Sequence, residues 1–160
     1  MRGSKSLVAM LTAAVLGLSG CGLPVPRDPS GTLDSVRGGV LHAGISPNGD
    51  LVVVDGAEPA GREVDAIEAF AESLDAEVAW TIGSEESLVR GLEEDRLDLV
   101  AGGLTDETPW AQKAGVTRPY TEITEEDGTT RKLVMLAPIG ENAFLSELEV
   151  FLVKHAESAS

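Results

Sequence analysis

The stretch from Leu97 to Tyr120 constrains the fold of this chain more than any other. It opens with a mostly apolar run, Leu97–Ala101, which stops at the pair Gly102–Gly103. A short apolar run that ends at two glycines is typical of a buried strand in a parallel sheet. In open α/β sheets, ligands bind just beyond the carboxyl ends of such strands. The sequence therefore predicts a candidate ligand loop at Thr105–Trp110.

Strand and helix patterns alternate along the rest of the chain. With 160 residues, the chain has room for one domain of ordinary size. Strands that alternate with helices of this length favour right-handed βαβ units and a parallel core sheet. We expect strands at 40–45, 51–55, 76–82, 97–101 and 132–138, and helices that begin at 62, 85 and 141.

Each predicted helix has one apolar face that is expected to pack on the sheet. The first helix presents Val64, Ile67, Phe70, Ala71 and Leu74 on one side, and Glu63, Asp65, Glu68 and Glu72 are expected to point to solvent. The second helix is predicted to be capped by Ser84 and buried through Leu88, Val89 and Leu92. The last helix offers Phe144, Leu145, Leu148, Phe151 and Leu152.

The net charge of the chain limits the classes of molecule that it is expected to bind. The formal net charge is −15, and it becomes −17 beyond residue 20, because that first part holds Arg2 and Lys5 and no acid. Such a surface repels nucleic acid and anionic lipid headgroups. It favours cationic ligands or basic partners, or it only keeps the protein soluble.

Residues 1–21 are predicted to be a lipoprotein signal peptide. A charged start, Arg2 and Lys5, precedes an apolar stretch, Leu7–Leu18, that is too short to span a bilayer comfortably. The following Leu18-Ser19-Gly20-Cys21 resembles the bacterial lipobox, in which the cysteine is acylated and becomes the first residue. An ordinary secretory signal with a stray cysteine is the alternative. Cys21 is the only cysteine, so neither an intrachain disulfide nor a cysteine metal site is expected.

Residues 22–38 contain three prolines and little periodicity, and they are predicted to tether a domain at 39–158 to the membrane. The protein is therefore expected in the cell envelope, held by lipid on the extracytoplasmic side. Gly22 after the cysteine is not Asp. In a Gram-negative cell, that resembles lipoproteins of the outer membrane that face the periplasm.

Four short motifs, in the right order and spacing, resemble one known family. They are Val40–Pro47, Gly61–Asp65, Leu97–Thr105 and Thr117–Tyr120. Together they are similar to the extracellular solute-binding proteins of ABC importers, in the group for polar amino acids (family 3). The resemblance implies an α/β fold: one lobe of a periplasmic-binding-protein (type II) fold, with an about five-stranded, mostly parallel sheet flanked by helices.

The first departure from the family is the missing second lobe. Family members insert a whole α/β lobe after the motif that ends at Tyr120, whereas here only residues 121–131 fill that place. Eleven residues cannot make a lobe. Residues 132–156 are expected to be the returning strand and the closing helix. A clamp that closes within this chain is therefore excluded, and a dimer that supplies the second jaw stays open.

The second departure concerns ligand groups. The family's T-P-E-R segment carries a threonine and an arginine that hold an amino acid's carboxylate. Counted without gaps from Gly103 to Tyr120, this segment falls on Glu107–Trp110, so an acid and an indole replace the two groups. The loop Pro47–Asp50 also lacks the family's aromatic residues. Amino-acid binding in the family manner is therefore not expected.

Two binding hypotheses follow for this altered rim. A small cationic ligand would meet the ring of Trp110 and the acids Asp50, Asp106 and Glu107, beside Thr105. Alternatively, a protein partner would be anchored by Trp110, Arg118 and Tyr120. The structural alternatives are that Trp110 covers the open sheet end, Arg118 pairs with a glutamate, and Tyr120 is a packed turn residue.

Catalysis is not predicted. The chain has no phosphate-loop, dinucleotide or HExxH pattern. His42 lies within a strand and His155 at the end of a helix, without a predictable nucleophile. Glu122, Glu125, Glu126 and Asp127 lack the spacing of a strong calcium loop and are treated as a solvated hairpin or linker. No catalytic residue, cofactor or metal is expected.

The sequence therefore predicts a membrane-anchored, non-catalytic, solute-binding-like lipoprotein associated with ABC transport. The alternative is a protein-binding accessory module of an envelope or transporter complex, such as one beside an ABC permease.

Overall fold

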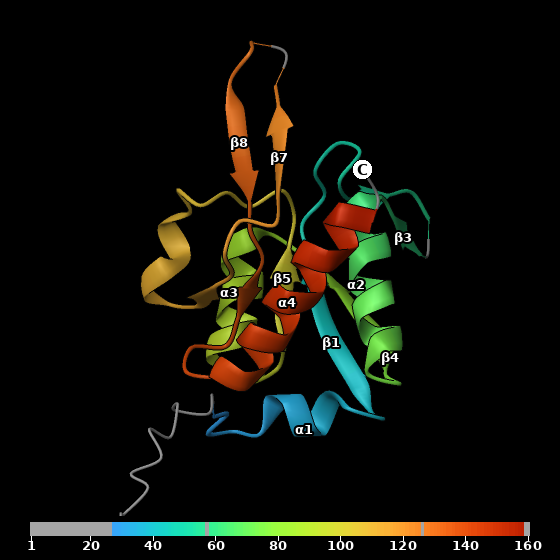
Figure 1. Ribbon diagram of the computed structural model, residues 1–160, viewed down its shortest axis with the longest axis vertical. Coiled ribbons are helices and arrows are strands. Elements are labelled where there is room, and N and C mark those ends of the chain that lie inside the picture. The colour runs from blue at the N-terminus through green and yellow to red at the C-terminus, as the bar shows by residue number, and fades with distance from the viewer. Residues whose placement is uncertain (1–26, 57, 126, 159–160) are drawn as a thin grey trace, which may run out of the picture.

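The computed structural model describes residues 27–56, 58–125 and 127–158, which fold around a five-stranded sheet (Figure 1). β1 pairs in parallel with β4 and β5, whereas β9 lies antiparallel between β5 and β6. Four of these five strands therefore run in one direction, which confirms the predicted mostly parallel sheet. The strands, in spatial order, are β4 (Glu77–Ile82), β1 (Val40–Ile45), β5 (Leu99–Ala101), β9 (Leu136–Ala137) and β6 (Gly115–Val116).

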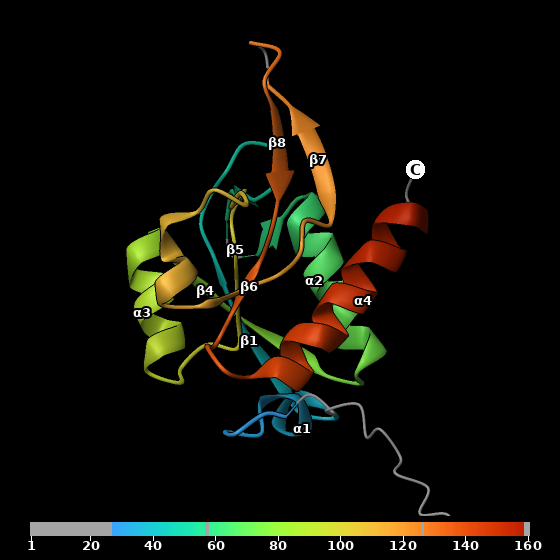
Figure 2. The same cartoon turned by 60° about the vertical axis from the view of Figure 1, so that its left-hand side comes forward.

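Helices cover both faces of the sheet (Figure 2). α2 (Arg62–Ser73) and α4 (Asn142–Ser158) pack on one face, and α3 (Glu85–Glu93) packs on the other. Beneath α2 and α4, the rings of Phe70 and Phe144 meet edge to face, with their centroids 5.8 Å apart. The predicted α/β architecture is thus confirmed, with an apolar cluster on each side of the sheet.

The predicted helix faces agree with the structure except at one residue. Val64, Ile67, Phe70 and Ala71 of α2 are buried, and so is Leu74, which directly follows the helix. Glu63 is the exception: it was expected to point to solvent, but it is only 1% exposed. Its carboxylate is buried because two other segments of the chain donate hydrogen bonds to it, as described below.

Of the other two predicted helices, α3 begins at the expected residue, Glu85, and α4 begins one residue later than expected, at Asn142. The Ser84 hydroxyl accepts a hydrogen bond from the Ser87 N–H at 3.4 Å, which caps α3. α3 buries Leu88, Val89 and Leu92. α4 buries Phe144, Leu148 and Leu152, and it packs Leu145 and Phe151, which are partly buried, against the same cluster.

Three predicted strands are shorter than expected. The strand expected at 97–101 is β5, which begins only at Leu99. The strand expected at 51–55 is only β2 (Val53–Val54), which pairs with β3 (Pro59–Ala60) in a separate two-stranded sheet. Leu51 and Val52 are nevertheless buried. The strand expected at 132–138 is split into the end of β8 and β9 by Val134 and Met135. Apolar content marked these residues as core, but it does not distinguish a core strand from a buried loop.

Residues 121–133 form a hairpin that projects beyond the body of the molecule (Figures 1 and 2). β7 (Thr121–Thr124) pairs with β8 (Thr130–Leu133) in antiparallel register. The chain then returns to the main sheet through β9, which pairs with β5. The predicted return of the chain to the first sheet is therefore confirmed, and a hairpin stands in the place where the family inserts a lobe.

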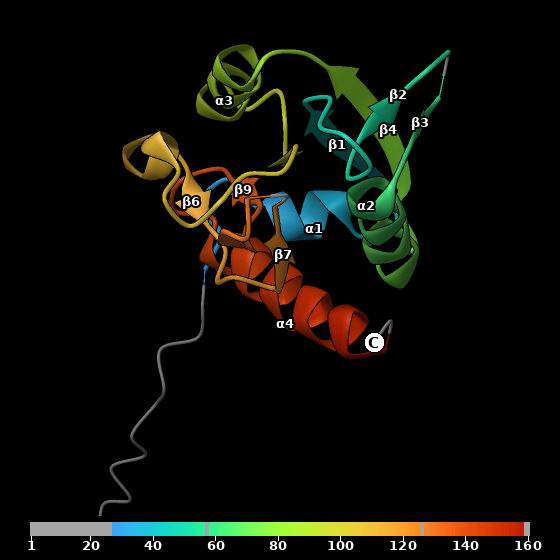
Figure 3. The same cartoon turned by 90° about the horizontal axis from the view of Figure 1, so that it is seen from above.

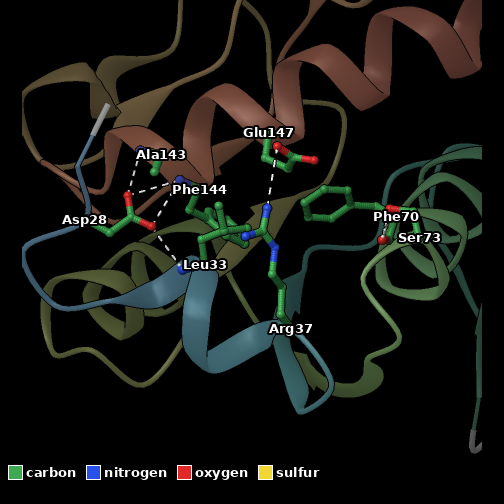
Figure 4. A network of polar contacts seen from close by, with 8 residues as sticks. All are labelled: Asp28, Leu33, Arg37, Phe70, Ser73, Ala143, Phe144 and Glu147. Atoms are coloured by element: carbon green, nitrogen blue, oxygen red, sulfur yellow. Dashed lines mark hydrogen bonds and ion pairs between the residues drawn. The ribbon is translucent and has the colours of Figure 1, made fainter. Parts of the chain in front are cut away.

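The segment predicted to be a tether is partly folded, which is a correction. α1 (Thr32–Val36) buries Leu33 and Val36 in the cluster under α2 and α4. The Asp28 carboxylate accepts hydrogen bonds from the Ala143 and Phe144 N–H groups at the start of α4, as Figure 4 shows. The domain therefore begins by residue 28 and not at residue 39.

A second carboxylate, that of Glu141, makes the converse contacts to those of Asp28. Glu141, just before α4, accepts hydrogen bonds from the N–H groups of Ser30 and Thr32 at 2.9 and 3.0 Å. Asp28 and Glu141 thus each stabilise the start of the other's segment, and we call this arrangement the reciprocal clamp. It fixes the N-terminal segment to the last helix.

Among the described helices, none has the length and apolar character needed to cross a bilayer.

Candidate functional site

The loops that follow β1 and β5 lie against each other at the carboxyl ends of these strands. The Ser46 N–H donates to the Ala101 carbonyl at 3.0 Å, and the Asn48 side-chain amide donates to the Gly102 carbonyl at 3.0 Å. Gly103 has a φ of +68°, and a Cβ at this position would collide with the Asn48 side chain. The approach of the two loops therefore requires glycine here. We call these two loops the ligand edge.

The hairpin forms the opposite wall of an open cleft of about 630 Å³ above the ligand edge. In this cleft, Asp50 and Arg62 form an ion pair of 3.1 Å that is exposed to solvent. The lining residues are Asn48, Asp50, Leu51 and Arg62 on one side, and Ile123, Thr124, Glu125 and Asp127 on the other. We call this space the hairpin cleft.

Carboxylates dominate the charge of the hairpin cleft. Asp50, Glu125 and Asp127 line the cleft together with Arg62. Asp50 pairs with Arg62 at 3.1 Å, and Glu125 pairs with Arg131 of β8 at 2.7 Å, so these three acids and two bases leave a net negative charge. Hydrogen bonds from Thr129 hold the pKa of the exposed Asp127 carboxyl below its usual range. The cleft is therefore anionic at neutral pH, which suits a cation and opposes a carboxylate.

A second hollow of about 370 Å³ lies beside β8. Thr105 and Glu107 line it together with Arg131 and Lys132. The Asp106 N–H donates to the Lys132 carbonyl at 3.1 Å, so the loop after β5 runs along the hairpin here. Thr105 and Glu107 thus line this hollow and not the cleft that Asp50 lines, so the structure does not bring these predicted residues into one pocket.

Trp110 contacts neither space. Its short 3₁₀ helix (Pro109–Gln112) places the ring on the apolar cluster beneath α3, and the indole N–H donates to Glu85 at 3.0 Å. The cation cage expected from Trp110, Asp50 and Glu107 is therefore not assembled. The reason is that the indole already has a carboxylate partner on α3.

Arg118 and Tyr120 also make contacts within the chain. The Arg118 guanidinium pairs with Glu149 of α4 at 2.9 Å. The Tyr120 hydroxyl donates to the Glu63 carboxylate at 2.6 Å. These are the contacts expected from the structural alternatives for both residues: an ion pair for Arg118 and a packed position for Tyr120.

Glu63 is the site residue that sequence reasoning missed. Burial raises the pKa of its carboxyl, although hydrogen bonds from Tyr120 and Gly103 act in the opposite direction. It borders a third cavity of about 350 Å³ between α2, α4 and the root of the hairpin. The sequence signal that could have identified Glu63 is the resemblance of Gly61–Asp65 to a family motif. Its charge alone suggests a residue that faces solvent.

The structure tests neither the predicted lipidation of Cys21 nor the expectation that the chain binds no metal ion. Cys21 lies outside the described residues. In the part of the chain that is described, no group of His, Cys, Asp and Glu side chains is arranged to hold a metal ion.

Comparison with known families identifies the fold. A family model for bacterial extracellular solute-binding proteins, family 3, matches residues 43–156. The chain belongs to this family. None of the curated proteins is similar enough to count as a relative.

Solved structures agree with this assignment at the level of the fold. The arginine-bound form of domain 1 from TmArgBP is 18% identical, with a TM-score of 0.66, and the match covers 76% of this chain and 97% of that one. A periplasmic binding protein of Salmonella typhimurium with high arginine specificity is 14% identical, with a TM-score of 0.63, over 74% and 93%. An ancestral cationic amino acid solute-binding protein is 13% identical, with a TM-score of 0.67, over 80% and 95%.

These findings confirm the family and the fold class predicted from the sequence. They support an extracytoplasmic, solute-binding-like role for this family 3 chain. The family and the fold are those of binding proteins.

Proposed function

We propose that this protein is a lipid-anchored, extracytoplasmic solute-binding module that works without catalysis, beside a transporter of the cell envelope. The observation that carries the proposal is the hairpin cleft. The ligand edge of a family 3 lobe is intact in outline, and the hairpin stands opposite it in place of a second lobe. The cleft is open, so a bound solute would remain partly hydrated and its affinity would be low.

The solute class follows from charge. Asp50, Glu125 and Asp127 make the hairpin cleft anionic, and at least two solved structures of the same fold have arginine-binding proteins as their subject. The resemblance puts Glu107 and Trp110 where the family grips a carboxylate, so that grip is absent. We therefore propose a small organic cation without a carboxylate, such as a polyamine.

Calorimetry tests this ligand class. We expect spermidine to bind weakly, with an affinity that falls as salt rises, and we expect no micromolar binding of free amino acids. The double variant Glu125→Gln with Asp127→Asn should weaken spermidine binding several-fold. Asp34→Asn, on α1 outside the cleft, is the matched control and should change nothing. Tight binding of an amino acid, or equal spermidine affinity in all variants, would overturn the proposed ligand class.

The lipid anchor is tested separately. Cys21→Ser removes the thiol that is acylated in lipoproteins, so the variant should lose its lipid and be released from the membrane fraction. Mass spectrometry of the chain and fractionation of cells measure the two effects. Membrane attachment that survives the substitution would count against the anchor.

A second candidate function is an accessory protein-binding module, and the projecting hairpin favours it. The hairpin extends beyond the sheet and carries both acids and bases, including Glu122, Arg131 and Lys132 (Figures 1 and 2). Pull-down from membranes with the charge-reversed variant Lys132→Glu, compared with calorimetry on the same variant, separates the candidates. Loss of a specific partner with unchanged spermidine binding favours the accessory role.

A further inference from the structure

One buried carboxylate joins three segments that are far apart in the sequence. Glu63 lies in the first turn of α2 and is 1% exposed. One of its oxygens accepts a hydrogen bond from the Tyr120 hydroxyl at 2.6 Å, at the root of the hairpin. The other accepts a hydrogen bond from the Gly103 N–H at 2.8 Å, in the loop after β5. The ligand edge and the hairpin therefore share one acceptor group.

The peptide unit held by Glu63 is held from its other end as well. The Gly103 N–H and the Gly102 carbonyl belong to the same peptide plane. The carbonyl accepts the Asn48 side-chain amide at 3.0 Å, whereas the N–H donates to Glu63. Because both flanking residues are glycines, side chains place no steric limit on rotation of this plane. Its orientation at the ligand edge therefore depends on these two hydrogen bonds.

The hairpin is attached to the same loop on its other strand. The Val134 N–H donates to the Leu104 carbonyl at 2.9 Å, and the Tyr120 N–H donates to the Leu133 carbonyl at 3.1 Å. A change at Glu63 would therefore reach both the loop after β5 and the root of β7. The loop after β5 is bonded to Asn48, which lines one wall of the hairpin cleft, and β7 forms part of the other wall.

The groups around Glu63 come from several elements. Arg62 and Asp65 flank it on α2, Tyr120 faces it from the hairpin root, and His155 of α4 lines the same cavity. Arg62 pairs with Asp50 on the same wall of the hairpin cleft. The ionised carboxylate accepts both hydrogen bonds, whereas a protonated carboxyl must use one oxygen as a donor. Because the Tyr120 oxygen can also accept, protonation would reverse the direction of that hydrogen bond and would remove the negative charge that the Gly103 N–H faces.

We propose that Glu63 is the positioning residue of the ligand edge: its carboxylate orients the Gly102–Gly103 peptide and couples it to the hairpin root. The inference rests on the proposed function only in that this edge is taken as the binding surface. The coupling itself is a property of the chain without ligand.

Amide hydrogen exchange on the full chain in detergent tests this coupling without any ligand. The variants are Glu63→Gln, Tyr120→Phe and the control Glu68→Gln, which changes an exposed acid on the same helix. In Glu63→Gln, the carboxamide oxygen can still accept from Gly103 while its NH2 group donates to the Tyr120 oxygen, so a further variant, Glu63→Met, removes both acceptors. In Glu63→Met, exchange should rise about tenfold at Gly103 and at the hairpin root. Tyr120→Phe removes one bond at the hairpin, yet it should also raise exchange at Gly103. Glu68→Gln should leave both unchanged.

A pH profile separates positioning from a merely structural role. The chemical shift of the Gly103 amide should titrate on acidification in the wild type and in Glu68→Gln, and the titration should vanish in Glu63→Gln. Unchanged exchange at Gly103 in Tyr120→Phe, or a uniform rise along the whole chain in both Glu63→Met and Tyr120→Phe, would overturn the proposal. A wild type that shows this coupling but binds no cation would overturn the proposed function alone.

Discussion

Trp110 makes two kinds of contact within the chain. Its ring packs on the apolar cluster beneath α3, beside Val116, and its indole N–H donates to Glu85 at 3.0 Å. An indole combines a large apolar surface with one donor, so it can lie between a core and a charged helix start. At this position, the side chain links the loop after β5 to the first turn of α3.

Substitutions at Trp110 should separate these two contacts. Trp110→Phe keeps a ring but loses the donor to Glu85, and it should lower the free energy of unfolding by about 1 kcal/mol. Trp110→Ala also loses the packing, and because the ring is only partly buried, the cost should be about 2 kcal/mol. Urea unfolding measures both values. Unchanged stability in Trp110→Ala would show that the ring serves a ligand or a partner and not the sheet.

Among the elements, α2 and α4 depend on each other most directly through aromatic rings. Phe70 of α2 contacts Phe144 at a centroid distance of 5.8 Å and Phe151 at 5.4 Å, both on α4. Phe70 and Phe144 have no exposed surface, whereas Phe151 is partly exposed. The two helices that cover this face of the sheet are therefore joined around one side chain.

Truncation of Phe70 should affect the whole face. Phe70→Ala leaves a cavity between two helices and the sheet, so we expect a loss of about 3–5 kcal/mol in the free energy of unfolding. Phe151→Ala is the matched control on α4, and its loss should be smaller because that ring is already partly hydrated. Guanidinium unfolding at one temperature measures both. A larger loss for Phe151→Ala would contradict this packing order.

Local patterns predicted the long elements well, and the reason is physical. The apolar period of α2, α3 and α4 and the cap at Ser84 are local signals, and the structure uses them. α1 escaped prediction because a five-residue helix has little stability of its own. It forms because the Asp28 and Glu141 carboxylates accept hydrogen bonds from the Leu33 and Thr32 N–H groups, and Glu141 is 109 residues away from Thr32 along the chain.

The sequence predicted where the candidate site lies, but it did not predict which side chains form hydrogen bonds with each other there. Its loops follow β1 and β5, as the glycine-terminated strand indicated. Glu63 was placed on the solvent side because its partners, Tyr120 and Gly103, are 57 and 40 residues away. The burial of a charge depends on such distant donors, and no helical period contains that information.

At the scale of the whole molecule, the reciprocal clamp and the hairpin lie at opposite ends (Figures 1 and 2). The view from above in Figure 3 shows α3 on the other side of the sheet from α4. α1 and the start of α4 form one end, and β7 and β8 project from the other. The segment that leads back towards Cys21 leaves the domain at the clamp. In a lipid-anchored protein, the ligand edge would therefore lie on the side away from the attachment point.

The clamp should hold α1 in place. Asp28→Ala removes the acceptor for the Leu33, Ala143 and Phe144 N–H groups, so α1 should detach before the rest unfolds. The loss of this cap is expected to cost about 1–2 kcal/mol. Limited proteolysis should then cut within residues 27–38 much faster than in the wild type. Asp28→Asn keeps one acceptor oxygen and should give an intermediate rate, and equal rates in all three proteins would contradict the role of the clamp.

Acid should loosen the same clamp through Glu141. Burial pushes the pKa of this carboxyl upwards, but hydrogen bonds from Ser30 and Thr32 outweigh burial and leave the pKa below its usual value. A depressed folded-state pKa stabilises the protein above the unfolded value of about 4.3, and this contribution is lost as pH falls through the lower folded value. Melting temperatures from about pH 6 to about pH 3 should fall less steeply in Glu141→Gln than in the wild type. A steeper fall in that variant would contradict this account.

The clamp also decides where a mechanical load enters the molecule. A pull on the N-terminal segment reaches the folded body at residue 28, where it acts on hydrogen bonds to the first turns of α1 and α4. Tension would detach α1 from the rest of the domain first, and this detachment would relax the load. The hairpin and the loop at Gly102–Gly103 lie at the other end of the molecule and do not carry this force. If the chain is anchored to a membrane, a pull on its N-terminal segment would therefore leave the shape of the binding surface unchanged.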